Sequence, residues 1–198
     1  MNYLAHAWLS FHQPEIVVGN MISDFVKGKK QFDLSPAIQK GIRLHRAIDN
    51  FTDTHPVTKE LKEFYRPHYR LYSGAFADVT YDHFLANDKN EFPAAEALKA
   101  FSATTYSILE DHFSGLPPGF QKIFPYMRSQ DWLFNYREKW LIEKSFWGLE
   151  CRATYLKESG IAFTIFNENI AAMRSCYARF FPELKDFATH TLQELLNG

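Results

Sequence analysis

Helix signals recur along nearly the whole chain, and they constrain its fold more than any other feature of the sequence. Valine, which favours strands, occurs only five times. Ser35 and Pro36 provide an N-cap and a first-turn proline for a helix that ends near Thr54, just before Pro56. Because such signals continue into the C-terminal region, the sequence predicts an all-α fold.

The predicted helices follow one another without an intervening linker. A chain of 198 residues with 46% apolar residues is long enough to bury one core, and no repeat or linker divides it. We therefore expect a single helical domain over residues 1–198. The expected helices cover approximately residues 2–11, 14–26, 36–54, 57–70, 75–87, 93–113, 118–127, 130–147 and 163–180, with a short last helix after Pro182.

Charge and cysteine content exclude several classes of protein. The formal net charge of -1 argues against a globally basic nucleic-acid binder. Cys151 and Cys176 alone cannot build a disulfide framework, so a reducing, cytoplasmic location is expected. The first residues lack the basic segment of a signal peptide, and no stretch reaches the roughly 18 apolar residues of a membrane span. We expect neither a nucleic-acid nor a membrane partner.

One stripe of the helix expected over residues 36–54 begins apolar and ends polar. Ile38, Ile42, His45, Asp49 and Thr52 are spaced so that they share one face. The side chains of His45 and Asp49 lie one turn apart, with Cβ atoms about 5–6 Å from each other. An ionised carboxylate on a core-facing stripe is costly unless it is paired or binds a metal ion.

Two other expected helices carry polar pairs at the same spacing. Asp78 and Asp82 are four residues apart, and His83 follows directly. Two carboxylates at this spacing repel each other unless a cation lies between them. Asn20 and Asp24 form a third pair. Three such pairs within 65 residues favour a metal site.

The types of candidate ligand narrow the choice of metal ion. The same residues could also have purely structural roles. Imidazole and carboxylate groups without thiolate suit Mn²⁺, Mg²⁺ or Fe²⁺ better than a structural zinc ion. His6 is a further possible contributor. Alternatively, His45 is a hydrogen-bonded core histidine, and Asp78 and Asp82 are surface acids.

Basic residues are concentrated toward the N-terminus. The first 70 residues hold ten Lys and Arg against seven Asp and Glu. Lys27, Lys29, Lys30 and Arg43 could attract an acidic partner or a phosphorylated substrate. An ordinary solvated face is the alternative for each of them.

Six aromatic residues lie close together between residues 132 and 147, whereas the common nucleotide-binding and hydrolase motifs are missing from the sequence. The aromatic side chains are expected to form core and groove wall rather than a base-stacking platform, and they comprise Trp132, Phe134, Tyr136, Trp140, Phe146 and Trp147.

Several ordered motifs together resemble the acyl carrier protein phosphodiesterase family. They run in order from residue 1 to about residue 137, and the ordered set is specific although each motif alone is weak. The motifs are MNYLAH at 1–6, GNMISDFVKG at 19–28, GIRLHRAID at 41–49, TD at 52–53, YDHFLA at 81–86, SQDWL at 129–133 and NYR at 135–137.

The resemblance implies an all-helical fold related to the HD-type metal phosphohydrolases, with a distorted helical core and additional C-terminal helices. It implies hydrolysis of the phosphodiester that joins 4'-phosphopantetheine to a serine of holo-acyl carrier protein, which leaves the apo form. It also implies a divalent metal, with Mn²⁺ favoured. The usual adjacent His-Asp pair is reversed here as Asp82-His83, and the other pair is His45 with Asp49.

This reaction assigns roles to the polar residues. A bound metal is expected to activate water and to offset charge on the phosphoryl oxygens. His83 or His6 would donate a proton to the leaving serine oxygen. Arg46 would clamp a phosphate oxygen, or it is an ordinary helix ion-pair partner. The metal ligands are expected from Asp24, His45, Asp49, Asp78 and Asp82, and the carrier protein is expected to dock on Lys27, Lys29, Lys30 and Arg43.

Two other functions stay open on the sequence. The chain could be an HD-like phosphohydrolase of nucleotides or of another small phosphodiester. It could instead be a non-catalytic helical module that binds an acidic partner protein. The recurring Asp and His pairs argue against the second, because a binding surface has no need to bury carboxylates.

Overall fold

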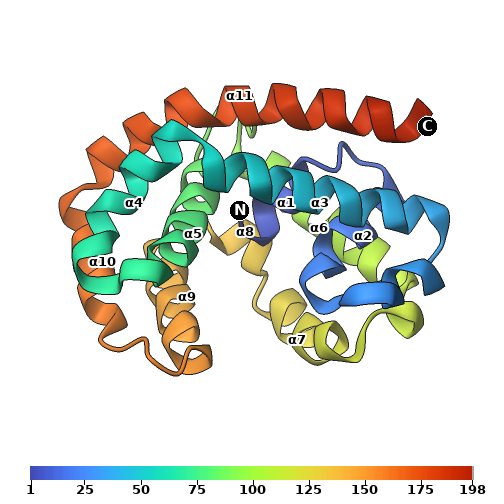
Figure 1. Cartoon of the computed structure of the whole chain (residues 1–198), viewed down its shortest axis with the longest axis horizontal. Coiled ribbons are helices and arrows are strands. Elements are labelled where there is room, and N and C mark those ends of the chain that lie inside the picture. The colour runs from blue at the N-terminus through green and yellow to red at the C-terminus, as the bar shows by residue number, and fades with distance from the viewer. Residues whose placement is uncertain (198) are drawn as a thin grey trace.

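A long C-terminal helix and two shorter helices form a roof from which two lobes descend (Figure 1). In this computed structural model, which describes residues 1–197, α11 (Ile170–Asn197) packs along α3 (Pro36–Thr54) and α4 (Pro56–Tyr69). Within the described residues every regular element is a helix. The expected all-α fold is therefore confirmed.

The two lobes are built from different parts of the chain (Figure 1). One lobe contains α2 (Pro14–Ile22), α6 (Ala95–Asp111) and α7 (Pro118–Ser129), and the other contains α5 (Ser73–Ala86), α9 (Lys139–Arg152) and α10 (Ser159–Glu168). Two short helices, α1 (Tyr3–Trp8) and α8 (Trp132–Asn135), lie between the lobes. Four 3-10 turns complete the structure, η1 (Ser23–Phe25), η2 (Gly28–Asp33), η3 (Arg70–Tyr72) and η4 (Phe113–Gly115).

Aromatic side chains hold the roof onto the lobe that contains α5 and α9. The ring of Tyr81 on α5 stacks on that of Phe180 on α11, with centroids 4.6 Å apart. Tyr65 on α4 stacks on Phe76 of α5 at 5.5 Å. Phe76 in turn meets Phe146 of α9 edge-on at 4.9 Å. All five side chains are fully buried or nearly so, and each large ring removes about 150–250 Å² from water.

Most helix boundaries agree with the expected ones, and the clearest case is α3. It covers Pro36–Thr54 as the sequence predicts, and the Ser35 hydroxyl accepts a hydrogen bond from the amide of Ile38. The expected helix over 130–147 is wrong, because a turn after Asn135 divides it into α8 and α9. The expected helix over 14–26 ends at Ile22 and continues as η1.

The expected interruption near residue 180 is also wrong, because α11 continues through Pro182. Proline removes one backbone donor and crowds the preceding turn, so this continuity needs compensation. Phe180, Phe181 and Leu184 flank the proline and are buried. Their burial against the roof and lobes offsets the missing hydrogen bond.

The cysteines and the helix lengths bear on the expected cellular location. Cys151 is exposed and Cys176 is buried, and both thiols are free. Among residues 1–197, no helix has both the length and the apolar character needed to cross a bilayer.

A close glycine contact fixes the crossing of α2 and α3. A Cβ atom added at Gly19 would lie 2.1 Å from the carbonyl oxygen of Ile38 and 2.8 Å from the Cα of Gly41. A Cβ atom added at Gly41 would lie 2.5 Å from the carbonyl oxygen of Ile16. These neighbours are backbone atoms, so they cannot move aside as a flexible side chain would. Only glycine permits this approach.

We predict that Gly41→Ala destabilises the protein by about 3 kcal/mol or more, because the added methyl group forces the two helices apart. Gly160→Ala is the matched control, since an added Cβ there meets nothing within 4 Å. That change should stabilise α10 by about 0.5–1 kcal/mol. Urea unfolding of both variants measures the difference, and equal stabilities would contradict the close-contact explanation.

Candidate metal centre

Three side chains from α1 and α3 converge beneath the roof. His6 Nε2 lies 3.2 Å from Asp49 Oδ1, and His45 Nε2 lies 3.0 Å from Asp49 Oδ2. The two imidazole rings stack with centroids 3.8 Å apart and planes 14° from parallel. One ligand atom from each of the three residues lies within 4.8 Å of the other two. This triad of His6, His45 and Asp49 has the spacing of a metal site.

The buried nitrogens of the triad lack hydrogen-bond partners. Both ring nitrogens of His6 and the Nε2 atom of His45 are buried without one, although the Asp49 carboxylate lies close. A buried polar atom left unpaired costs about 1–3 kcal/mol, and such atoms are rare in folded proteins. A divalent cation between the imidazoles and the carboxylate would satisfy them. The donor set therefore fits a metal ion.

The backbone of α2 orients His45. Its Nδ1 atom donates a hydrogen bond to the carbonyl oxygen of Asn20 over 2.7 Å. When the ring is neutral, this bond keeps the proton on Nδ1 and leaves the Nε2 lone pair directed at Asp49. Such an outer hydrogen bond is how metal-binding histidines are usually held. The glycine contact between Gly19 and Gly41 makes this approach possible.

Charges within the triad are strongly coupled. Burial would lower the pKa of His45, but the carboxylates of Asp24 and Asp49 raise it to about 9. Burial and the nearby positive charge of His45 lower the pKa of His6 to about 4. Burial opposes ionisation of Asp49, yet the adjacent imidazoles of His45 and His6 and the ammonium group of Met1 hold its pKa well below the usual range. The site thus favours one positive charge, on His45, opposite the carboxylates of Asp24 and Asp49. A bound metal cation can replace that charge.

Asp24 is the exposed carboxylate of the site. It lies in η1, directly after α2, and its Oδ1 atom is 3.3 Å from His45 Nε2. Its side chain is 74% exposed, whereas that of Asp49 is 38% exposed. The interaction with His45 lowers the pKa of Asp24. Asp24 is therefore ionised at the solvent side of the triad.

Asp78 and Asp82, which the spacing brought into the predicted ligand pool, contact other groups. Asp78 Oδ1 lies 3.1 Å from the ammonium group of Met1, which is also 3.2 Å from Asp49 Oδ1. Asp82 is fully buried, and its two oxygens accept hydrogen bonds from the amides of Leu4 and Ala5 at 2.7 and 3.2 Å. It therefore caps the start of α1, the helix that carries His6. Burial raises the pKa of Asp82 to about 7.

His83, predicted as a possible proton donor, faces away from the triad. Its Nδ1 atom donates to the carbonyl oxygen of Tyr136 over 2.8 Å, and its ring meets Phe166 edge-on at 5.2 Å. Burial lowers the pKa of His83 to about 4. A neutral, buried histidine in this position serves packing.

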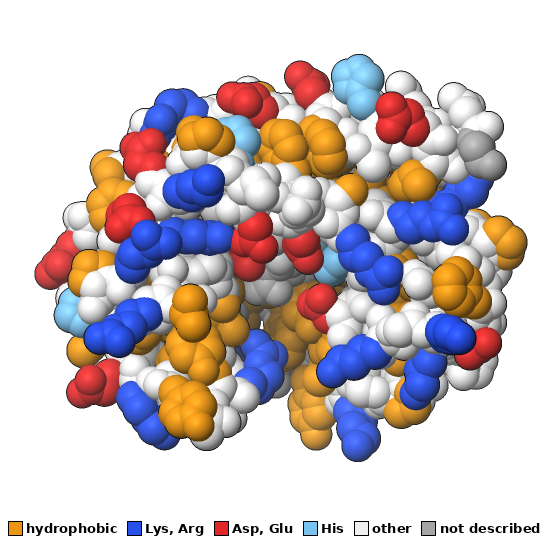
Figure 2. Space-filling model, in the orientation of Figure 1, with side chains coloured by type: hydrophobic (Ala, Val, Ile, Leu, Met, Phe, Trp, Pro, Cys, Tyr) orange, Lys and Arg blue, Asp and Glu red, His pale blue; other side chains and the backbone are white. Residues whose placement is uncertain are grey.

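The predicted basic residues lie on the surface near the triad. Arg46 donates to the side-chain oxygen of Gln31 over 2.9 Å and approaches the carbonyl oxygen of Val26 at 3.5 Å. Lys29 and Lys30 lie in η2 and Lys27 directly precedes it; these three lysines and Arg43 on α3 are exposed. Figure 2 shows acidic and histidine side chains gathered above a hollow between the lobes, with basic side chains on both sides.

Sequence reasoning missed the orienting role of Asn20. The pair Asn20 and Asp24 was noticed for its side chains, but the group that holds His45 is the Asn20 backbone carbonyl. The Asn20 side chain instead donates to the carbonyl oxygen of His6 over 2.9 Å. In the sequence, only Gly19 and Gly41 indicate that the Asn20 carbonyl can come close to His45.

Comparison with known proteins identifies similar chains. A family model described as acyl carrier protein phosphodiesterase matches residues 1–184. A Yersinia pestis protein named acyl carrier protein phosphodiesterase is 30% identical over 190 residues, covering 96% of this chain and 98% of that protein. Proteins of the same name from Photorhabdus laumondii and Shigella boydii are 28% and 29% identical, with 95% and 98% of their own lengths covered. No solved structure matches this chain.

We predict that Mn²⁺ binds to the triad and stabilises the fold. At a free concentration one hundred times Kd, the gain is about 2.7 kcal/mol. Asp49→Asn should weaken binding at least about a hundredfold, because the only carboxylate of the triad is lost. Asp53→Asn is the matched control, since Asp53 lies on the same helix, is 71% exposed and pairs with Lys62. Isothermal titration calorimetry measures the Kd for Mn²⁺ of both variants. A wild-type Kd in Asp49→Asn would exclude the triad as the binding site.

We predict that His83 contributes to acid sensitivity. Its pKa is about 4 in the folded chain and about 6.5 when unfolded, so only the unfolded chain gains this proton as the pH falls from 6.5 toward 4. Stability therefore decreases with falling pH. His83→Gln should reduce the loss between pH 7.5 and pH 5 by roughly 1–2 kcal/mol. Urea unfolding with a chelator present tests this, and an unchanged pH dependence would show that His83 is not held neutral.

Proposed function

The chain belongs to the acyl carrier protein phosphodiesterase family, and we propose that it is a phosphoric diester hydrolase that removes 4'-phosphopantetheine from holo-acyl carrier protein. The observation that carries the proposal is the triad, whose buried imidazole nitrogens have no hydrogen-bond partner and face a carboxylate. Such a site suits a cation used for phosphoester hydrolysis. The side chains of Asp24 and Asp49 are 74% and 38% exposed, so a phosphodiester on a protein can reach the site from solvent.

The proposed cation ligands are His6, His45 and Asp49. When bound, a divalent cation such as Mn²⁺ lowers the pKa of water and offsets negative charge on the phosphoryl oxygens. His45 is prepared for this role by its bond to the Asn20 carbonyl, which directs Nε2 inward. The cap that Asp82 places on α1 fixes the helix from which His6 projects.

We assign proton handling to Asp24. In the reaction a bond forms between water oxygen and phosphorus, and the bond between phosphorus and the serine oxygen of the carrier protein breaks. Water must lose a proton and the serine oxygen must gain one. Asp24 is ionised, mainly exposed and 3.3 Å from His45, so it can accept the proton that water loses at the edge of the site and, once protonated, donate it to the leaving serine oxygen. We do not assign this role to His83, because the contacts of its ring are with Tyr136 and Phe166.

The carrier protein is proposed to dock on the basic surface formed by Lys27, Lys29, Lys30 and Arg43. The three lysines follow Asp24 closely in the chain, and all four side chains are exposed. Acyl carrier protein is acidic, so complementary charge would steer its serine toward the triad. Arg46 lies beside this surface and is held by Gln31 rather than directed at the triad. The free thiols of Cys151 and Cys176 are consistent with a cytoplasmic enzyme.

Hydrolysis of purified holo-acyl carrier protein, followed as release of 4'-phosphopantetheine, tests the proposal. We predict Mn²⁺-dependent turnover that a chelator abolishes. Asp49→Asn should lose both Mn²⁺ binding and turnover, whereas Asp24→Asn should keep Mn²⁺ binding and lose about a hundredfold or more in kcat. Asp53→Asn should behave as wild type. Metal-independent turnover, or full activity in Asp49→Asn, would refute the proposed site.

Salt and charge reversal test the docking surface. We predict that Lys29→Glu combined with Lys30→Glu raises KM for holo-acyl carrier protein about tenfold or more, with a smaller change in kcat. Added salt should likewise raise the KM of the wild-type protein. The matched control reverses Lys89 and Lys157, two exposed lysines outside the proposed surface. Equal effects of both double variants would indicate a general charge effect instead of a docking surface.

A further inference from the structure

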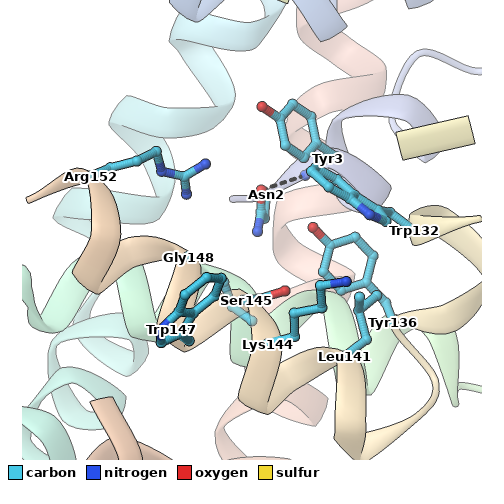
Figure 3. Close-up of a pocket in the computed structure, with 11 residues that line it drawn as sticks. Asn2, Tyr3, Trp132, Tyr136, Leu141, Lys144, Ser145, Trp147, Gly148 and Arg152 are labelled. Carbon is cyan, nitrogen blue, oxygen red and sulfur yellow. Dashed lines mark hydrogen bonds between the residues drawn. The ribbon is translucent and has the colours of Figure 1, made fainter. Parts of the chain in front are cut away.

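A narrow pocket opens beside the triad, between the start of α1, α8 and α9 (Figure 3). Its volume is about 170 Å³. Pockets for drug-sized ligands usually begin near 300 Å³, so this one suits a slim chain rather than a bulky ring system. Its walls are mostly apolar, and the side chains that matter below are Asn2, Tyr3, Trp132, Ser145, Trp147 and Arg152.

The pocket and the triad share a wall. Asn2 and Tyr3 line the pocket and directly follow Met1, whose ammonium group lies 3.2 Å from Asp49. On the opposite side, Val79 lines the pocket and directly follows Asp78, which contacts the same ammonium group. On both segments, therefore, the pocket lining is one residue removed from a group that contacts Asp49 or its ammonium partner.

Aromatic rings form the sides of the pocket. Tyr3 and Trp132 lie with ring centroids 6.3 Å apart, and Trp147 stands across from them on α9 (Figure 3). Trp147 is 60% exposed, an unusual position for so large an apolar surface. A ligand chain lying between these rings would cover that surface and gain hydrophobic contacts.

Polar groups are placed at intervals along the pocket. The side chain of Asn2 and the hydroxyl of Ser145 point into it, where they can bind the amide groups of a ligand (Figure 3). The guanidinium of Arg152 faces Asn2 across the opening (Figure 3). Because Asn2 adjoins the triad through Met1, Arg152 places positive charge at the end where a phosphate would lie.

We propose that this pocket binds the pantetheine arm of the substrate, an inference that rests on the proposed function. Pantetheine is a slim chain with two amide groups, a branched dimethyl carbon and a terminal thiol. In the substrate the phosphate joins this chain to the serine, so the chain and the serine extend from opposite sides of the phosphate. The apolar walls match its chain, and Asn2 and Ser145 match its amides. The guanidinium of Arg152 would offset the negative charge of the phosphate to which the arm is joined. The carrier protein then lies on the other side of the triad, toward the basic surface.

Filling the pocket tests this assignment. Gly148 lines the pocket, and an added Cβ there meets nothing within 4 Å, so the phenyl group of Gly148→Phe would grow into the free space. Gly160→Phe is the matched control, because Gly160 is also helical and also open but lies outside the pocket. We expect Gly148→Phe to weaken binding of the arm about tenfold or more, and Gly160→Phe to leave it unchanged.

Two readouts separate this proposal from the proposed function. KM for holo-acyl carrier protein should rise about tenfold or more in Gly148→Phe, and direct titration with free pantetheine, followed by tryptophan fluorescence, should show saturable binding that Gly148→Phe removes. A wild-type KM together with undiminished pantetheine binding would overturn the pocket assignment. If the wild type fails to hydrolyse holo-acyl carrier protein, the proposed function is overturned, and the titration alone then decides the pocket.

A second pair of variants applies if Gly148→Phe does not fold. Trp147→Ala removes one aromatic wall of the pocket, whereas Trp140→Ala removes a tryptophan from the same helix that is 49% exposed and lies outside the pocket. We expect only Trp147→Ala to weaken pantetheine binding and to raise KM. Equal effects of the two substitutions would overturn the pocket assignment.

Discussion

The contact between Gly19 and Gly41 is the constraint on which the rest of the site depends. It lets the backbones of α2 and α3 approach so closely that a single methyl group on either glycine would collide with a carbonyl oxygen. At this distance the carbonyl of Asn20 reaches His45 Nδ1 and fixes the direction of the imidazole. The geometry of the triad is thus set by backbone packing one helical turn away from it, and a metal ligand is held as firmly as the helix crossing itself.

A second constraint is the balance of charge around α1. Asp82 is fully buried, yet both of its oxygens accept amide hydrogen bonds at the positive end of the helix that carries His6. Asp78 and Asp49 share the ammonium group of Met1. Three carboxylates therefore gather in a small space, two of them on one ammonium group and the third on two backbone amides. The imidazole nitrogens of the triad are among the buried atoms without a hydrogen-bond partner, and a further cation fits there.

Much of this arrangement could be predicted from the sequence, because it follows from local rules. The N-cap at Ser35 and the stripe that carries His45 and Asp49 both lie within one helix, and α3 forms as expected. The spacing of Asp78 and Asp82 predicts a cation between them, but spacing within one helix does not distinguish a metal ion from an ammonium group or from the amides at a helix end. Pro182 was misjudged for a related reason, since the burial of its neighbours by other helices outweighs its local effect.

The central claim is that His6, His45 and Asp49 together hold a divalent cation. Anomalous diffraction at the manganese absorption edge, from crystals grown with Mn²⁺, tests it most directly. We predict an anomalous peak within bonding distance of the Nε2 atoms of both histidines and of a carboxylate oxygen of Asp49, with the His45 bond to the Asn20 carbonyl retained. A peak at another site, or no peak between the three residues at saturating Mn²⁺, would contradict it.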